Sequence, residues 1–136
     1  MIEVFFYGLF MDERILLQNG ISATNSRKAS LANYGLRIGQ RASLLPSQDE
    51  TAYGIVMSVN KEALDQLYSE ASVSDYIPEK VQVTTDHKEV IDAICYNLPA
   101  DTMSGTNPAY AEALLELATS LDFPPHYLRN IAKYVV

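Results

Sequence analysis

The chain has 136 residues, of which 48% are hydrophobic and 20% are charged. These proportions are typical of a folded domain with a hydrophobic core and exclude a disordered chain. The length fits one domain over residues 1–136. The formal net charge of -7 argues against nucleic-acid binding, because that affinity depends on clustered Lys and Arg side chains.

The apolar stretch MIEVFFYGLF at residues 1–10 lacks the basic n-region of a signal peptide and is interrupted by Glu3. It therefore predicts a first strand and not a signal peptide. No stretch approaches the ~20 apolar residues of a membrane span. The single cysteine, Cys95, cannot form a disulfide within the chain, and we expect it to be buried in a reducing compartment. We therefore expect a cytoplasmic protein that does not bind membranes.

A strand over residues 2–7 opens the chain and runs directly into Gly8. β-Branched and aromatic residues favour the strand, and the glycine marks a bend or a close approach of the backbone. Asp12 is a suitable N-cap for a short helix from Glu13 to about Asn19, which Gly20 closes. The order is strand, glycine turn and helix.

Three further strands are predicted after a polar connector at residues 22–28. They cover residues 31–39, 42–46 and 51–59, with a turn at the polar residues 47–50. In the last of them the residues alternate between two faces, as in a strand covered at least partly on both sides.

Asn60 is a plausible N-cap for a helix over residues 61–70, with Leu64 and Leu67 facing inward. Two strands follow at about residues 76–85 and 89–97. A polar turn at Asp86, His87 and Lys88 joins them, so we expect them to pair antiparallel.

Asn107 and Pro108 form a start signal for a helix, which a break at Pro124 and Pro125 separates from a second one. Both helices carry an apolar stripe at helical spacing. Together these elements predict an α+β fold, in which a small mixed β-barrel of about six strands carries flanking helices.

The motifs of the common nucleotide, dinucleotide, serine-hydrolase and zinc-protease sites are absent from the sequence. The two histidines, His87 and His126, lie in a predicted turn and at a helix start, where a solvated role is expected. We therefore expect neither a metal nor another cofactor.

Four stretches, in order, resemble the γ-glutamylcyclotransferase superfamily, which includes the avirulence-induced-gene-like proteins. They are VFFYGLFM; NYGLRIG followed by ASLLPS and TAYGIVMSV; ALDQLYSEASVSDYIPEKVQV; and DAICYNL with the helical pair NPAYAEALLELATSLDFPPHYLRNI. The resemblance implies the barrel fold of that family. It also implies release of 5-oxoproline from a small γ-glutamyl substrate.

The resemblance also assigns site residues. Glu70 corresponds to the family's general acid/base, Tyr76 lines the pocket, and the ligand loop consists of Tyr7, Gly8, Leu9 and Phe10. This sequence departs from the family pattern at three positions: Leu9 replaces a serine, Tyr68 stands three residues after Asp65 where the family has glutamate, and Ala71 replaces a glycine.

The implied chemistry needs few protein groups. The α-amine of a γ-glutamyl compound can attack its own γ-carbonyl, so the protein mainly has to hold the geometry. One carboxylate within hydrogen-bond reach can move the protons, and an apolar hollow raises the pKa of such a carboxyl group. Consecutive backbone N–H groups in the loop can hold the substrate carboxylate and a developing oxyanion.

Two other functions stay open from the sequence. If Glu70 is a solvated charge at a helix end, the chain is a non-catalytic small-ligand binding protein on the same scaffold. A partner-binding module that uses the exposed side of the last helices, with homodimer formation, is the third possibility.

Overall fold

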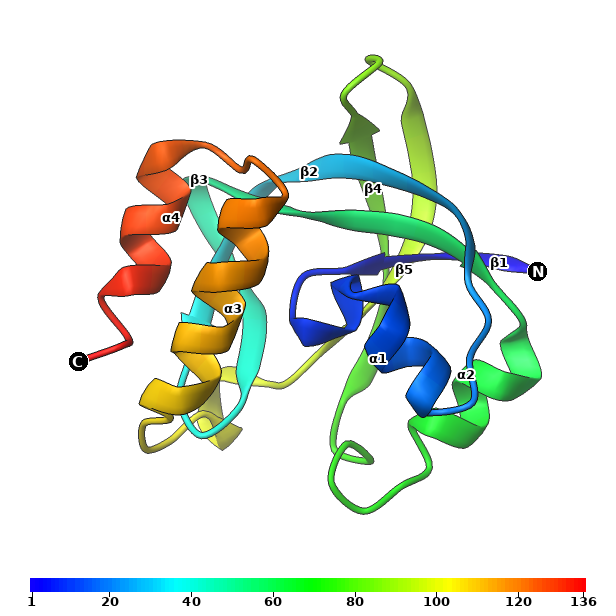
Figure 1. The fold of residues 1–136 in the computed structure, drawn as a ribbon, viewed down its shortest axis with the longest axis horizontal. Helices are drawn as coiled ribbons and strands as arrows, with labels where there is room; N and C mark the ends of the chain where they lie inside the picture. Colours follow the sequence, from blue (N-terminus) through cyan, green and yellow to red (C-terminus); the bar gives the residue numbers. More distant parts are fainter.

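The computed structural model describes all 136 residues as an α+β fold around a closed β-barrel (Figure 1). The strands are β1 (Ile2–Phe6), β2 (Thr24–Ile38), β3 (Ala42–Val59), β4 (Ile77–Thr85) and β5 (Val90–Asn97). They close in the order β1-β3-β2-β4-β5. Only β1 and β5 pair in parallel. The predicted fold class is confirmed, with five strands in place of about six.

The strand count differs because β3 runs without interruption through the turn predicted at residues 47–50. Ala32 pairs with Thr51 and Tyr34 pairs with Pro46, so residues 47–50 lie opposite Asn33 in an irregular part of the ladder. Such bulges bend a strand pair without ending it. The polar residues 47–50 were therefore misread as a turn between two strands.

The polar connector predicted at residues 22–28 is also largely strand, since β2 begins at Thr24. Its first residues are exposed or half-buried. Arg27 pairs with Val56 of β3 and Lys28 with Ile55. Backbone pairing with β3 holds this polar segment in the sheet, although its side chains lack the hydrophobic alternation of a typical strand.

The first three helices begin at the predicted residues, and their caps are formed as expected, whereas the fourth begins at Pro125, within the predicted break. They are α1 (Glu13–Gln18), α2 (Lys61–Leu67), α3 (Pro108–Ser120) and α4 (Pro125–Ala132), with 3₁₀ segments η1 (Leu9–Met11) and η2 (Ala100–Thr102). The side chains of Asp12, Asn60 and Asn107 each accept backbone N–H groups at the first turn. Helix α2 ends at Leu67, earlier than predicted, and leaves Glu70 in the turn that follows.

The core joins the barrel interior to the helices in one cluster of 30 buried residues. Helices α3 and α4 lie side by side on one flank of the barrel (Figure 1), and they bury Leu114, Ala118 and Ile131. Cys95 is fully buried on β5, as predicted. None of the helices combines the length and the apolar character needed to cross a bilayer.

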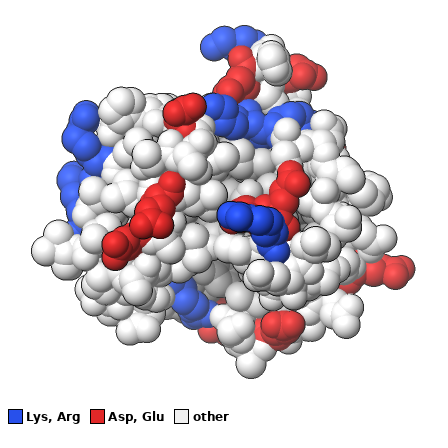
Figure 2. Space-filling model, viewed as in Figure 1, with Lys and Arg blue, Asp and Glu red and all other residues white.

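The β4–β5 hairpin projects from the barrel at the top of Figure 1. Its strands pair antiparallel from Ile77 opposite Asn97 to Thr84 opposite Val90, as predicted. Figure 2 shows both signs of charge at its tip and largely uncharged surface over much of the rest of this face.

Candidate ligand-binding site

A cavity of about 410 Å³ lies where the end of β1, the β2–β3 turn, the end of α2 and the start of α3 meet. This volume is within the roughly 300–1,000 Å³ of small-molecule sites. Aromatic side chains dominate the wall: Phe5, Phe6, Tyr7, Phe10, Tyr68, Tyr76, Tyr96 and Tyr110. The polar lining residues are Gln40, Arg41, Ser72 and Asn107. No Asp, Glu, Lys or His side chain lines the cavity.

The turn after β1 brings backbone N–H groups to the cavity. The N–H groups of Met11 and Asp12 donate to the carbonyls of Gly8 and Leu9, both at 3.0 Å. The N–H groups of Gly8, Leu9 and Phe10 precede this first turn, and such N–H groups have no partner within the helical segment. That these N–H groups hold a ligand stays a prediction.

Gly8 is closely packed, and its backbone angle is ordinary. Its φ is -107°, which any residue adopts. A Cβ built on Gly8 would collide with the hydroxyl of Tyr110, which α3 carries over the turn. The start of α3 thus covers part of the predicted ligand loop.

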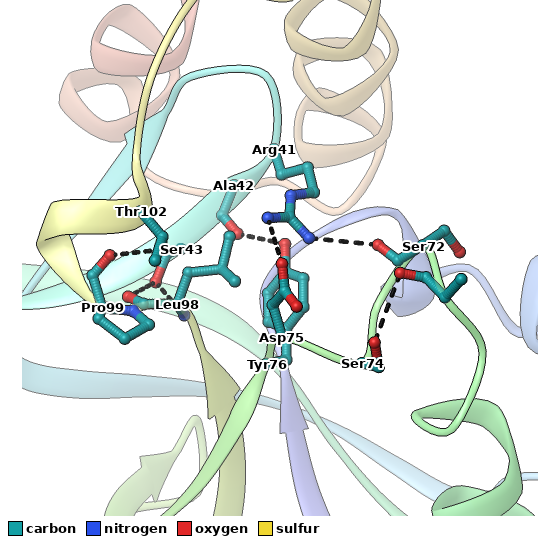
Figure 3. Close-up of polar contacts among 11 residues, drawn as sticks. Arg41, Ala42, Ser43, Ser72, Ser74, Asp75, Tyr76, Leu98, Pro99 and Thr102 are labelled. Carbon is teal, nitrogen blue, oxygen red and sulfur yellow. Dashed lines mark hydrogen bonds and ion pairs between the residues drawn. The ribbon is translucent and has the colours of Figure 1, made fainter.

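Two tyrosines are fixed by hydrogen bonds to backbone carbonyls. The Tyr7 hydroxyl donates to the carbonyl of Tyr96, and the Tyr76 hydroxyl donates to the carbonyl of Ala42, each at 2.7 Å. Figure 3 shows the second of these contacts. Tyr76 lies just before β4 and not in it, so its ring can turn from the strand end towards the β2–β3 turn.

Burial raises the pKa of the cavity tyrosines above its usual value. This holds for Tyr7, Tyr68 and Tyr110, and for Tyr76, whose pKa rises to about 12. At neutral pH these phenols keep their protons, so they can donate hydrogen bonds and form apolar walls. They cannot serve as bases there.

Arg41, in the turn between β2 and β3, is the only charged side chain of the lining. Its guanidinium donates to the Ser72 carbonyl at 3.3 Å and pairs with the carboxylate of Asp75 at 3.2 Å (Figure 3). It also lies 5.7 Å from the centre of the Tyr76 ring. The segment after α2 is thereby tied to the β2–β3 turn.

The structure brings together five of the six residues that the resemblance assigned to the site. Tyr7, Gly8, Leu9, Phe10 and Tyr76 all line the cavity.

Glu70 is the sixth residue, and the structure does not bring it to the cavity. It lies exposed in the turn after α2, where its N–H donates to the Leu67 carbonyl. Its carboxylate makes no hydrogen bond or ion pair with the protein, and the apolar surroundings expected for an acid/base are missing. Tyr68, and not Glu70, lines the cavity at the end of α2. The role of Glu70 stays a prediction.

Sequence reasoning missed Arg41 and Tyr110 as lining residues. Both lie far along the chain from the Gly8 turn, and the resemblance assigned neither of them to the site. Tyr68 could have been found from the sequence, because it stands at the position where the resemblance expects the glutamate of the site. Elsewhere, no three His, Cys, Asp or Glu side chains come close enough to hold a metal ion.

Comparison with known families identifies the scaffold. Residues 4–114 match the family described as gamma-glutamyl cyclotransferase, AIG2-like. The chain belongs to this family. A comparison with curated proteins finds no match.

Solved structures of this family's fold resemble the chain along most of its length. One described as gamma-glutamyl cyclotransferase has a TM-score of 0.78 at 24% identity, covering 96% of this chain and 85% of its own. Uncharacterized protein loc79017 from Homo sapiens has a TM-score of 0.76 at 21% identity, with the same coverage. YkqA from Bacillus subtilis has a TM-score of 0.77 at 21% identity, covering 98% of this chain and 54% of its own. At these identities the likeness establishes the fold alone.

Proposed function

We propose that this family member binds a small organic molecule in the cavity, without the acid/base step of cyclotransfer. The observation that carries the proposal is the composition of the lining, which has one cation, several aromatic rings and no carboxylate. Enclosed apolar pockets with a few converging polar groups are typical of ligand sites. The proton transfers of cyclisation need a positioned acid/base, and the tyrosines that fill the wall are too weakly acidic for that role at neutral pH.

The second candidate is the cyclotransferase reaction itself, in which a γ-glutamyl compound closes to 5-oxoproline with Glu70 as acid/base. Family membership favours it. So does the place of Glu70 in the chain, because Ser72 and Val73 of the same turn line the cavity. For this reaction the turn has to rearrange and carry the Glu70 carboxylate inward. Tyr68, stacked on Tyr96, is the side chain it would meet.

Binding is tested by calorimetry with 5-oxoproline, γ-glutamylglycine, γ-glutamyl-ε-lysine and hydrocinnamate. Wild type is compared with Val73→Trp, which fills the cavity from the turn. Saturable binding that Val73→Trp abolishes supports the proposal. Failure of all four compounds to bind the wild type contradicts it.

Catalysis is tested by the release of 5-oxoproline from the two γ-glutamyl compounds. The proposal expects wild type and Glu70→Gln to give the same background rate. It also expects Tyr68→Glu, which introduces a carboxylate into the cavity wall, to be the only variant that releases 5-oxoproline faster than this background. Turnover by wild type that Glu70→Gln abolishes establishes the second candidate instead.

A further inference from the structure

We infer that the cavity selects amphipathic monocarboxylates, with the ligand carboxylate on Arg41 and an apolar body among the aromatic rings. The inference rests on the proposed binding function and names its ligand class. It assigns Arg41 as a specificity-determining residue at the rim of the site.

The charges of the cavity favour a ligand that has a negative group and no positive group. Arg41 is the only charged lining residue, so a bound carboxylate has a partner. No carboxylate of the lining would pair with a ligand ammonium. Removing a charged group from water without a partner is strongly unfavourable. A zwitterion such as an amino acid therefore fits this wall less well than a simple carboxylate.

Arg41 keeps donor capacity for a ligand. A guanidinium has five N–H donors, and the protein uses two of them, at 3.2 and 3.3 Å. Both distances exceed the roughly 2.9–3.0 Å that is most common for N–H···O bonds. The Asp75 side chain is 61% exposed, and exposed ion pairs contribute little to stability. A ligand carboxylate can therefore pair with Arg41 in the bidentate geometry that guanidinium groups favour.

The interior suits an apolar body. Phe5, Phe6 and Phe10 carry no polar atoms in their side chains. The Tyr7 and Tyr76 hydroxyls are already committed to backbone carbonyls. Aromatic rings stack or pack edge to face on other rings, and Phe10 already contacts Tyr68 in the edge-on manner, with 6.5 Å between centroids. A ligand with a ring or a short hydrocarbon chain matches these walls.

The test compares hydrocinnamate with its neutral amide, hydrocinnamide, which has nearly the same shape. Calorimetry on the wild-type protein is expected to give at least about tenfold tighter binding of the acid, because charge-assisted bonds are the stronger ones. Arg41→Gln is expected to remove this preference, so that both compounds bind equally. Arg37→Gln is the matched control, since Arg37 has similar exposure and also pairs with an acid, Glu50, away from the cavity.

The outcomes separate the inference from the function on which it rests. Equal affinity of acid and amide for wild type overturns the inference, whatever the variants do. A preference that persists in Arg41→Gln, or that Arg37→Gln also removes, overturns the assignment of Arg41. If γ-glutamylglycine binds and hydrocinnamate does not, the ligand class is wrong and the binding function stands. If none of the compounds binds, the binding function fails as well.

Discussion

The ring of Tyr68, at the end of α2, lies parallel to the ring of Tyr96 on β5, with 3.8 Å between the centroids and 4° between the planes. This stack closes the cavity at the place where the family resemblance expects a glutamate. It ties the end of a helix to the barrel wall, so a change that alters the chemistry of the site also affects the packing.

Removing either ring is expected to lower the free energy of unfolding. Removing both rings is expected to lower it by less than the sum of the two single losses. Aromatic pairs contribute about 0.5–1.5 kcal/mol beyond the area they bury. Chemical unfolding of Tyr68→Ala, Tyr96→Ala and the double variant measures this coupling. Tyr68→Phe is the control, because the Tyr68 hydroxyl forms no hydrogen bond with the protein, and it should remain close to wild type. Additive effects would contradict a stabilising stack.

Gly8→Ala is expected to be harmful only while Tyr110 keeps its hydroxyl. The added methyl group would meet that oxygen, whereas the next ring atom, Cζ, lies at 3.8 Å, an ordinary contact. Overpacking of this kind typically costs about 1–3 kcal/mol. Thermal unfolding should show Gly8→Ala well below wild type, and the double variant Gly8→Ala/Tyr110→Phe close to Tyr110→Phe. An equal loss in both backgrounds would mean that the backbone, and not the phenol, restricts this position.

Ser43→Ala is expected to destabilise the fold although it removes a single oxygen. The buried Ser43 hydroxyl donates to the Leu98 carbonyl at 3.0 Å and accepts from the Leu98 N–H at 2.8 Å (Figure 3). Leaving buried backbone groups unpaired costs about 1–3 kcal/mol. The control is Ser74→Ala, an exposed serine that should change the free energy of unfolding by no more than about 0.5 kcal/mol. Equal small effects would indicate that water replaces the hydroxyl.

Stability is expected to fall in alkaline solution because of the cavity tyrosines. Burial raises the pKa of Tyr76 to about 12 and that of Tyr110 higher still, whereas an unfolded chain ionises tyrosine near pH ~10. Above that pH the unfolded state holds fewer protons than the folded state, so folding becomes less favourable as pH rises. The contribution is complete below about pH 10 and is lost as the pH passes through the pKa values of the folded protein.

Chemical unfolding across this pH range, with tyrosinate absorbance followed in parallel, measures the effect. Tyr110→Phe should lose less stability between neutral and alkaline pH than wild type, because it has one such group fewer. Parallel pH profiles for the two proteins would show that this phenol ionises equally easily in both states.

The local signals of the sequence determined the ends of most elements. Asp12, Asn60 and Asn107 marked helix starts because their short side chains bind the first free N–H groups, an interaction within a few residues. The strand before Gly8 and the β4–β5 pair were readable for the same reason. Residues 47–50 were misread, because whether polar residues form a turn or a bulge depends on the strand opposite them, which lies in another part of the chain.

From the sequence alone we could infer an α+β barrel of a particular family and a loop at Gly8, since these follow from local patterns and their order. Only the tertiary structure decided what surrounds that loop. It placed Arg41 and Tyr110 on the cavity, Tyr68 in its wall and Glu70 outside it. Side chains distant in sequence become neighbours only when the barrel closes, and the length of α2 fixes which residue of the following turn faces inward.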